Sequence, residues 1–134
     1  EDMDFLIREL KRHRDKEGLL MANFVDFDSM YGHRRNAQGY AQCLEDFDAM
    51  LGELLPLLQD DELLMITSDH GNDPTMSGTD HTREEVPLVA YSPSLTESTD
   101  LGTRLTFADL GQTIMDNFDA GKLPFGTSFL NDLK

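Results

Sequence analysis

The chain has 134 residues, of which 39% are hydrophobic, which is enough for one domain with a packed core. Its 26 acidic and 11 basic residues give a formal net charge of -15. Such a charge repels nucleic acids and the anionic face of a membrane, so we expect neither as a partner. Cations are the ligands that this balance favours.

The cysteine content and the N-terminal residues indicate a cytoplasmic protein. Cys43 is the only cysteine, so the chain cannot form an internal disulfide. The first residues, EDMDFLIREL, lack the basic and apolar regions of a signal peptide. No apolar run approaches the roughly 18 residues of a membrane span. We therefore expect a soluble protein in a reducing compartment.

The first half of the chain predicts a helix, a buried strand and a second helix. Apolar residues recur at helical spacing over residues 3–16, and Gly18 follows where a helix would stop. Residues 19–27 are almost continuously apolar, as in a strand that is buried on both faces. A second amphipathic helix is expected over residues 40–55, where it should kink or end because Pro56 follows.

The second half predicts two strands and a further helix. Residues 62–67, ELLMIT, and residues 86–92, VPLVAYS, are short apolar runs separated by a polar loop. A helix is expected over residues 107–118, with Thr106 before it and Asp109 three residues later, as in a capped helix. Strands separated by helices indicate an α/β fold with a mainly parallel sheet flanked by helices. Ligand sites in such folds gather at the carboxyl ends of the strands.

Two polar clusters contain the residues that are suited to chemistry. The first, DFDSMYGHRR at residues 26–35, follows the first predicted strand. The second, DHGND at residues 69–73 with TDHT at residues 79–82, follows the next strand. Three of the four histidines lie in these clusters beside aspartates. Carboxylates with neutral imidazoles suit a divalent metal such as Mn or Zn, whereas Ca and Mg sites consist mainly of oxygen ligands.

Other motifs do not explain these clusters. An EF-hand loop that begins at Asp26 would place Met30 and Ala37 at positions 5 and 12, where ligands are required. The sequence contains neither HExxH nor paired CxxC patterns, so a thermolysin-type or structural zinc site is unsupported. Arg34 and Arg35 could orient ligands or bind phosphate, but surface ion pairs explain them equally well. We therefore assign no catalytic or cofactor-binding residue.

The segments DFDSMYGHRRN, TSDHGNDPTMSGTDHTRE and TFADLGQTI resemble phosphopentomutases, which belong to the alkaline phosphatase superfamily. The similarity covers nearly all of residues 19–130. It implies an alkaline-phosphatase-like core and an isomerase that moves a phosphate between the 1- and 5-positions of ribose or 2-deoxyribose. The family's reaction passes through a phosphorylated threonine and uses two Mn ions.

The resemblance also implies the metal ligands. In the family, one metal is held by an Asp, a His five residues later and a more distant His. These ligands correspond to Asp28, His33 and His81. An adjacent Asp-His pair contributes to the second metal, and it corresponds to Asp69 and His70.

By the same resemblance, residues 1–134 are the C-terminal portion of the catalytic core, without its N-terminal portion and without the cap domain. The phosphorylated threonine and a further Asp ligand have no counterpart before Leu19. We therefore expect the chain alone to be inactive, and to associate with itself or with the missing part through an exposed sheet edge. The alternatives are a phosphoglycerate mutase or a phosphatase of the same superfamily, or a noncatalytic metal-binding module.

Overall fold

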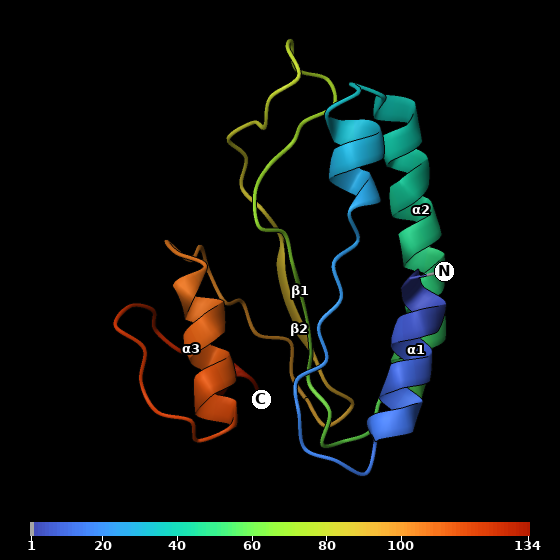
Figure 1. Cartoon of the computed structure of the whole chain (residues 1–134). Coiled ribbons are helices and arrows are strands. Elements are labelled where there is room, and N and C mark those ends of the chain that lie inside the picture. The colour runs from blue at the N-terminus through green and yellow to red at the C-terminus, as the bar shows by residue number, and fades with distance from the viewer. Residues whose placement is uncertain (1) are drawn as a thin grey trace. The chain divides into compact units, whose positions relative to one another are not determined.

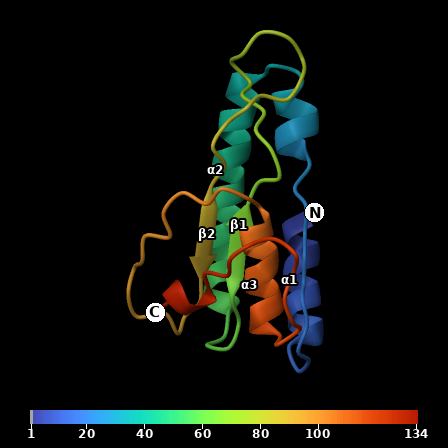
Figure 2. The same cartoon turned by 90° about the vertical axis from the view of Figure 1, so that its left-hand side faces the viewer.

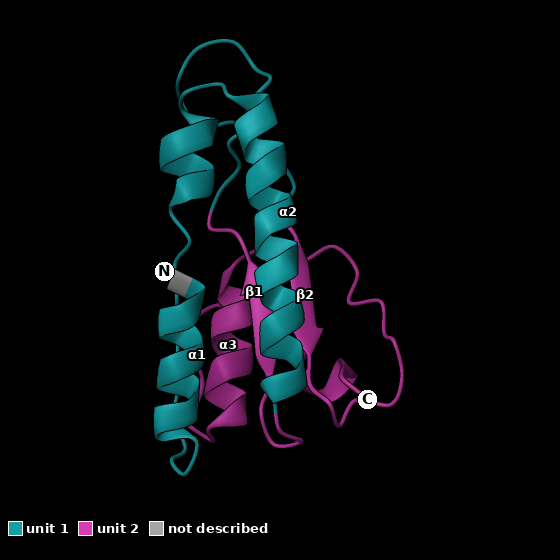
Figure 3. Cartoon of the chain, turned by 90° about the vertical axis from the view of Figure 1, so that its right-hand side faces the viewer, with its two compact units in different colours: residues 1–58, 70–86 teal, residues 59–69, 87–134 magenta. Residues whose placement is uncertain are grey.

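The computed structural model describes residues 2–134, and these divide into two units (Figure 1). The first unit comprises residues 2–58 and His70–Val86, and the second comprises Gln59–Asp69 and Pro87–Lys134. Each unit is thus built from two stretches of chain that are separate in the sequence (Figure 3). Both predicted polar clusters, apart from residue 69, belong to the first unit.

The first predicted helix is confirmed as α1, Asp2–His13, which ends slightly earlier than the apolar pattern suggested. Its last turn carries Lys11, Arg12 and His13. Positive side chains at this end are favourable because they face the negative end of the helix dipole.

Within residues 2–134, no helix combines the length and the apolar character needed to cross a membrane.

The prediction of a strand over residues 19–27 is wrong for this structure. Residues 19–24 have no regular secondary structure, and the sheet of the described residues contains only two other strands. Leu19, Met21 and Val25 are 60%, 84% and 51% exposed, although the apolar run predicted burial on both faces. A strand forms only with hydrogen-bonded neighbours, and no strand of the described residues pairs with this segment.

The chain then enters a π-helix, η1, Phe27–Gly32, which packs against helix α2, Ala37–Leu54. The ring of Phe27 meets those of Tyr40 and Phe47 edge to face, with centroids 5.5 and 6.0 Å apart. Aromatic pairs favour this arrangement, so the contacts fix η1 beside the first turns of α2 (Figure 1). This packing positions the residues that follow Phe27.

Helix α2 confirms the second predicted helix, and both of its ends have a local cause. At the N-terminus, the Asn36 side chain accepts a hydrogen bond from the Gly39 N–H at 2.9 Å. At the C-terminus, the α-helix gives way to a 3₁₀ turn, η2, Leu55–Leu57, which contains Pro56. Proline cannot donate the backbone hydrogen bond that an α-helix requires, so the predicted end near residue 55 is confirmed.

The two later strands are confirmed, but they are not parallel. Strands β1, Leu64–Thr67, and β2, Leu88–Tyr91, form a two-stranded antiparallel sheet in which Leu64 lies opposite Tyr91 (Figure 2). A parallel pair needs a crossover connection, usually a helix, whereas residues 68–87 contain none. Helices and strands are both present, and the parallel direction predicted for these strands is corrected.

The last predicted helix is confirmed as α3, Ala108–Asn117. The capping box predicted from Thr106 and Asp109 is not formed, because the N-cap residue is Phe107 and the Thr106 hydroxyl accepts the Ala108 N–H, at 3.2 Å, rather than the Asp109 N–H. Asp109 has a different role, because its carboxylate accepts the Thr127 N–H at 2.9 Å. One face of α3 thereby holds the C-terminal tail, whose Phe129 side chain is fully buried.

Candidate metal centre

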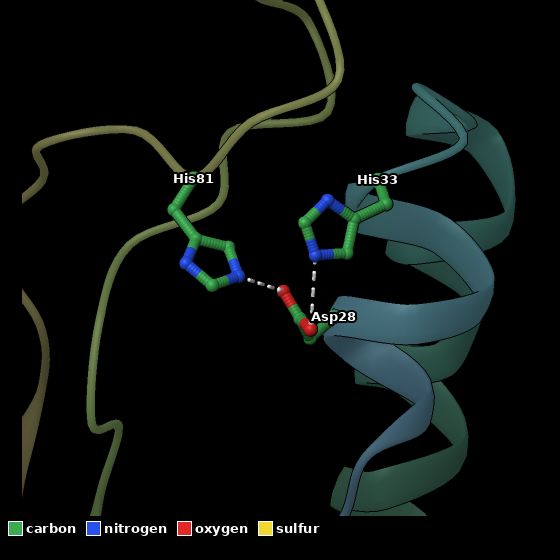
Figure 4. A group of neighbouring side chains, drawn as sticks. All are labelled: Asp28, His33 and His81. Carbon is green, nitrogen blue, oxygen red and sulfur yellow. Dashed lines mark ion pairs between the residues drawn. The ribbon is translucent and has the colours of Figure 1, made fainter.

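Three of the five predicted metal ligands come together in the first unit. The Nε2 atom of His33 lies 3.3 Å from Oδ2 of Asp28, and the Nε2 atom of His81 lies 3.3 Å from Oδ1. One ligand atom from each residue can be chosen so that all three lie within 4.8 Å of one another. Figure 4 shows both imidazoles turned toward the carboxylate, His33 from the end of η1 and His81 from a loop.

The five-residue spacing of Asp28 and His33 follows from the π-helix. The His33 N–H donates to the Asp28 carbonyl oxygen at 2.9 Å, which is the bond from residue i+5 to residue i that defines this helix. In an α-helix the bonded residues would be four apart, and these two side chains would diverge around the axis. The single π-helical turn therefore places both ligands on one side of η1.

The loop that carries His81 is fixed by its own hydrogen bonds. Gly71 and Thr82 form an isolated antiparallel bridge, in which the Thr82 N–H donates to the Gly71 carbonyl oxygen at 3.1 Å. The Thr82 hydroxyl accepts the Asp73 N–H at 2.7 Å. These bonds join the start of the loop to its end, and His81 directly precedes the bridge.

The contacts of His33 are compatible with a metal ion between its ring and Asp28. Its Nδ1 lies 2.5 Å from the Thr79 carbonyl oxygen, which can only accept, so Nδ1 carries the proton. In the neutral ring, the Nε2 lone pair then faces the carboxylate of Asp28 at 3.3 Å. Two acceptors at this distance need a proton or a metal ion between them. Metal–ligand bonds of about 2.1 Å place neighbouring ligand atoms roughly 3.0–3.4 Å apart, so the arrangement fits a metal.

The surroundings of Asp28 favour its charged form. Burial by itself raises the pKa of this carboxyl group. The hydrogen bond from Asn72 and the positive charge that His33, His81 and His70 carry when protonated outweigh that effect, so the pKa lies below its ordinary value. An ionised carboxylate is the form that binds a cation.

The remaining two predicted ligands lie outside this group. The His70 ring stacks on the His81 ring, with centroids 3.7 Å apart and planes inclined by 22°. Its Nδ1 lies 3.3 Å from the Gly71 carbonyl oxygen. Asp69 lies in the second unit, two residues beyond the end of β1. The structure therefore brings Asp28, His33 and His81 together. The assignment of these three residues to one metal, and of Asp69 and His70 to a second, stays a prediction.

Two further residues contact the site and were not assigned from the sequence. The Asn72 side chain donates to Asp28 Oδ1 at 2.6 Å, and Arg35 donates to the Asn72 side-chain oxygen at 2.7 Å. Each stands two residues after a predicted histidine ligand, Arg35 after His33 and Asn72 after His70. This proximity was the available signal, but the sequence does not show which polar side chains of a cluster face inward.

Comparison with known proteins assigns the chain to a protein superfamily and shows that it is similar to a particular enzyme. Residues 1–122 match the family described as the Metalloenzyme superfamily, so the chain belongs to that superfamily. Membership supports dependence on a divalent metal, in agreement with the group around Asp28. A particular relative is the phosphopentomutase of Levilactobacillus brevis, to which the chain is 57% identical over 120 residues. The resemblance that the motifs indicated is thereby confirmed.

The match covers most of this chain but a smaller part of the relative. The aligned residues are 90% of this chain and 30% of the L. brevis protein, so the chain spans about 30% of the length of the curated relative it matches. The match therefore identifies the kind of core from which these residues come. The activity and substrate of a whole enzyme also depend on the other 70%.

Proposed function

We propose that the chain is the metal-binding part of a phosphopentomutase, an isomerase that interconverts the 1- and 5-phosphates of ribose or 2-deoxyribose. The observation that carries the proposal is the convergence of Asp28, His33 and His81 within a chain that is 57% identical to the L. brevis enzyme. The identity indicates the reaction, and the geometry supports a functional rather than a degenerate copy of its metal site.

The metal ligands follow from the same proposal. Asp28, His33 and His81 would hold one divalent ion, and Asp69 with His70 would contribute to a second; Mn²⁺ suits this mixture of oxygen and nitrogen donors. Such ions neutralise the charge of a transferring phosphoryl group and stabilise its attacking and leaving oxygens. Two carboxylates against four positive charges leave the site cationic, which favours a sugar phosphate as substrate.

Within the proposal, this chain holds metal and the rest of the protein completes the catalytic cycle. We place residues 1–134 in the C-terminal portion of the core domain, whose N-terminal portion supplies the phosphorylated threonine and a further Asp ligand. A separate cap domain would contribute the contacts to the sugar. Strands from the remaining core would also complete a mainly parallel sheet. The single cysteine and the metal chemistry suit the reducing cytoplasm.

We also propose that the chain by itself self-associates. Leu19, Met21 and Val25 expose apolar surface along a segment that pairs with no strand of the described residues. Such surface favours association because water is excluded from it. Sedimentation velocity should show oligomers whose population rises with concentration. A single monomeric boundary at all concentrations would contradict this.

The proposed reaction is tested on the full-length product of the gene, supplied with Mn²⁺ and followed by ³¹P NMR. We expect interconversion of ribose 1-phosphate and ribose 5-phosphate, and no turnover by the 134-residue chain. Asp28→Ala in the full-length protein should lower the rate by more than about 100-fold. Asp48→Ala, a change at an exposed residue of α2, should leave it unaltered.

Other products would redirect the assignment. Interconversion of 2- and 3-phosphoglycerate would identify a phosphoglycerate mutase, and release of inorganic phosphate would identify a phosphatase. Binding of Mn²⁺ without any of these reactions would favour a noncatalytic module.

A further inference from the structure

We propose that Asn72 and Arg35 are positioning residues, which hold Asp28 and the loop that carries His81 in the geometry that binds metal. The inference rests on the proposed metal centre. It adds that contacts of Asn72 and Arg35 keep the ligands of that centre in place before a metal binds. Neither residue is a predicted ligand. Their contacts nevertheless reach Asp28 and the residue before His81.

Asn72 connects Asp28 to Arg35 and can do so in only one orientation. Its side-chain nitrogen donates to Asp28 Oδ1 at 2.6 Å, and its oxygen accepts from Arg35 Nη1 at 2.7 Å. Because a carboxylate only accepts and a guanidinium only donates, a reversed amide would lose both bonds. Asn72 is 9% exposed, so water cannot readily replace either partner. The amide therefore fixes the direction of the Asp28 carboxylate.

Gly32 provides the space that Asn72 occupies. A Cβ atom at Gly32 would lie 2.6 Å from the Asn72 side-chain nitrogen and 2.7 Å from its Cγ. Real side chains do not approach so closely, so η1 can accept the amide only with a glycine at this position. The Gly32 carbonyl oxygen also accepts from Arg35 Nη1 at 3.1 Å. The end of η1 is thus shaped around this pair of residues.

Arg35 links the end of η1 to the loop before His81. Its Nε donates to the Gly78 carbonyl oxygen at 2.6 Å. Its Nη1 and Nη2 donate to the carbonyl oxygens of Asp73 and Asp80 at 2.8 and 2.5 Å. Lysine has neither the planar shape nor the number of donors to bind three separated carbonyls in this way. The Asp80 contact fixes the residue directly before His81.

The backbone of Arg35 agrees with a specific role. Its φ angle is +51°, in the left-handed region that residues other than glycine rarely adopt. Such a conformation persists where surrounding contacts determine it, and here the guanidinium contacts do so. Arg34 is the matched comparison, because it is adjacent, exposed and without a side-chain hydrogen bond or ion pair among the described residues.

The first test uses the 134-residue chain without metal. NMR measures the exchange of the Asn72 side-chain amide protons in the parent, in Arg35→Lys and in Arg34→Lys. We expect slow exchange in the parent, exchange at least about tenfold faster in Arg35→Lys, and no change in Arg34→Lys. Equal exchange in Arg35→Lys and in the parent would overturn the inference, whether or not the chain binds metal.

The second test asks whether Arg35 acts through Asn72. Calorimetric titration with Mn²⁺ compares Arg35→Lys, Asn72→Ala and the double variant, with circular dichroism to verify folding. Each single change should weaken Mn²⁺ binding by about 10–100-fold. The double variant should bind Mn²⁺ with about the affinity of the single variant that binds it less tightly. Multiplying effects, or unchanged affinities, would overturn the inference. If Arg35→Lys unfolds the chain, Asn72→Ala decides, because it leaves the backbone contacts of Arg35 in place.

These tests separate this inference from the proposed function. If Asp28→Ala abolishes Mn²⁺ binding while the Arg35 and Asn72 variants bind Mn²⁺ like the parent, the metal centre is retained and the positioning role is rejected. Parent binding that is insensitive to Asp28→Ala would reject the metal centre itself, and the metal-free exchange measurement would still decide whether Arg35 holds Asn72.

Discussion

Replacing Gly32 by alanine should disturb the metal centre without altering any proposed ligand. The added methyl group would meet the Asn72 side chain at 2.6–2.7 Å and the Phe27 carbonyl oxygen at 2.9 Å. Carbon atoms in contact normally lie about 3.5–4.0 Å apart, so the overlap with Asn72 Cγ is roughly 1 Å. The Phe27 oxygen belongs to the backbone of η1, so the methyl group would displace the Asn72 side chain and also strain the backbone of η1.

The expected cost is about 1–3 kcal/mol in the free energy of unfolding, which is typical of an overpacked interior. Moving Asn72 also lengthens its hydrogen bonds to Asp28 and Arg35, so we expect Mn²⁺ binding to weaken by about tenfold or more. Gly52→Ala is the matched control, because Gly52 is exposed on α2 and its added Cβ would meet nothing within 4 Å. The control should gain about 0.5–1 kcal/mol through helix propensity.

Urea unfolding followed by circular dichroism gives the stabilities, and calorimetry gives the Mn²⁺ affinities. Opposite shifts in the urea midpoint for the two alanine variants would support the close approach of Gly32 and Asn72. If Gly32→Ala is as stable as Gly52→Ala and binds Mn²⁺ like the parent, the packing described for the centre is refuted. A stability loss with unchanged affinity would retain the packing and reject the influence of Asn72 on Asp28.

Two further predictions concern stability. Thr113→Val should cost about 1–3 kcal/mol, because it leaves the buried N–H of Phe129 without the Thr113 hydroxyl that accepts it at 3.0 Å; faster amide exchange at Phe129 checks this, and an unchanged rate would contradict it. Asp28→Asn should reduce the acid sensitivity of the metal-free chain. The pKa of Asp28 is lower in the folded chain than in the unfolded chain. Its ionised carboxylate therefore adds to the free energy of unfolding above the unfolded pKa of about 3.9, and this stabilisation is lost as the pH falls through the folded pKa. Urea midpoints from pH 7 to pH 3 should show this effect, and Asp48→Asn should not.

The helices could be predicted because local residues determine them. The apolar faces of α1, α2 and α3 repeat at helical spacing, and Pro56 ends α2 by a constraint on its own backbone. The N-terminal cap of α2 by Asn36 likewise depends on neighbours in the sequence. None of these features requires a distant partner, so periodicity and capping are sufficient to identify them.

The strand over residues 19–27 and the sheet direction failed for the opposite reason. An apolar run shows that a segment can be buried, but strand formation depends on partners that the run does not specify. The direction of β1 and β2 depends on the connection between them, and residues 68–87 return without a crossover helix. Both predictions relied on sheet partners that the sequence of the strands does not identify.

The candidate site, too, was predictable where motifs mark its residues and not where distant contacts determine them. The spacing of Asp28 and His33 was readable, and the motif resemblance added His81 from a distant loop. The π-helical turn that gives the spacing its geometry was not predicted, because residues 26–32 carry no local signal for a π-helix that we can identify. An orienting role for Arg35 was weighed from the sequence but could not be separated from a surface ion pair, since its contacts are carbonyl oxygens more than 35 residues away in the sequence.

The central claim is that Asp28, His33 and His81 form a metal site, and Mn²⁺ titration of the 134-residue chain by calorimetry tests it most directly. We predict saturable binding that weakens at least about tenfold in Asp28→Ala and in His81→Ala, and is unchanged in Asp48→Ala. Equal binding by all four proteins would contradict the claim, because the ion would then be held by the general acidic surface. Absence of binding in the parent would show that these three residues are not sufficient to hold the ion.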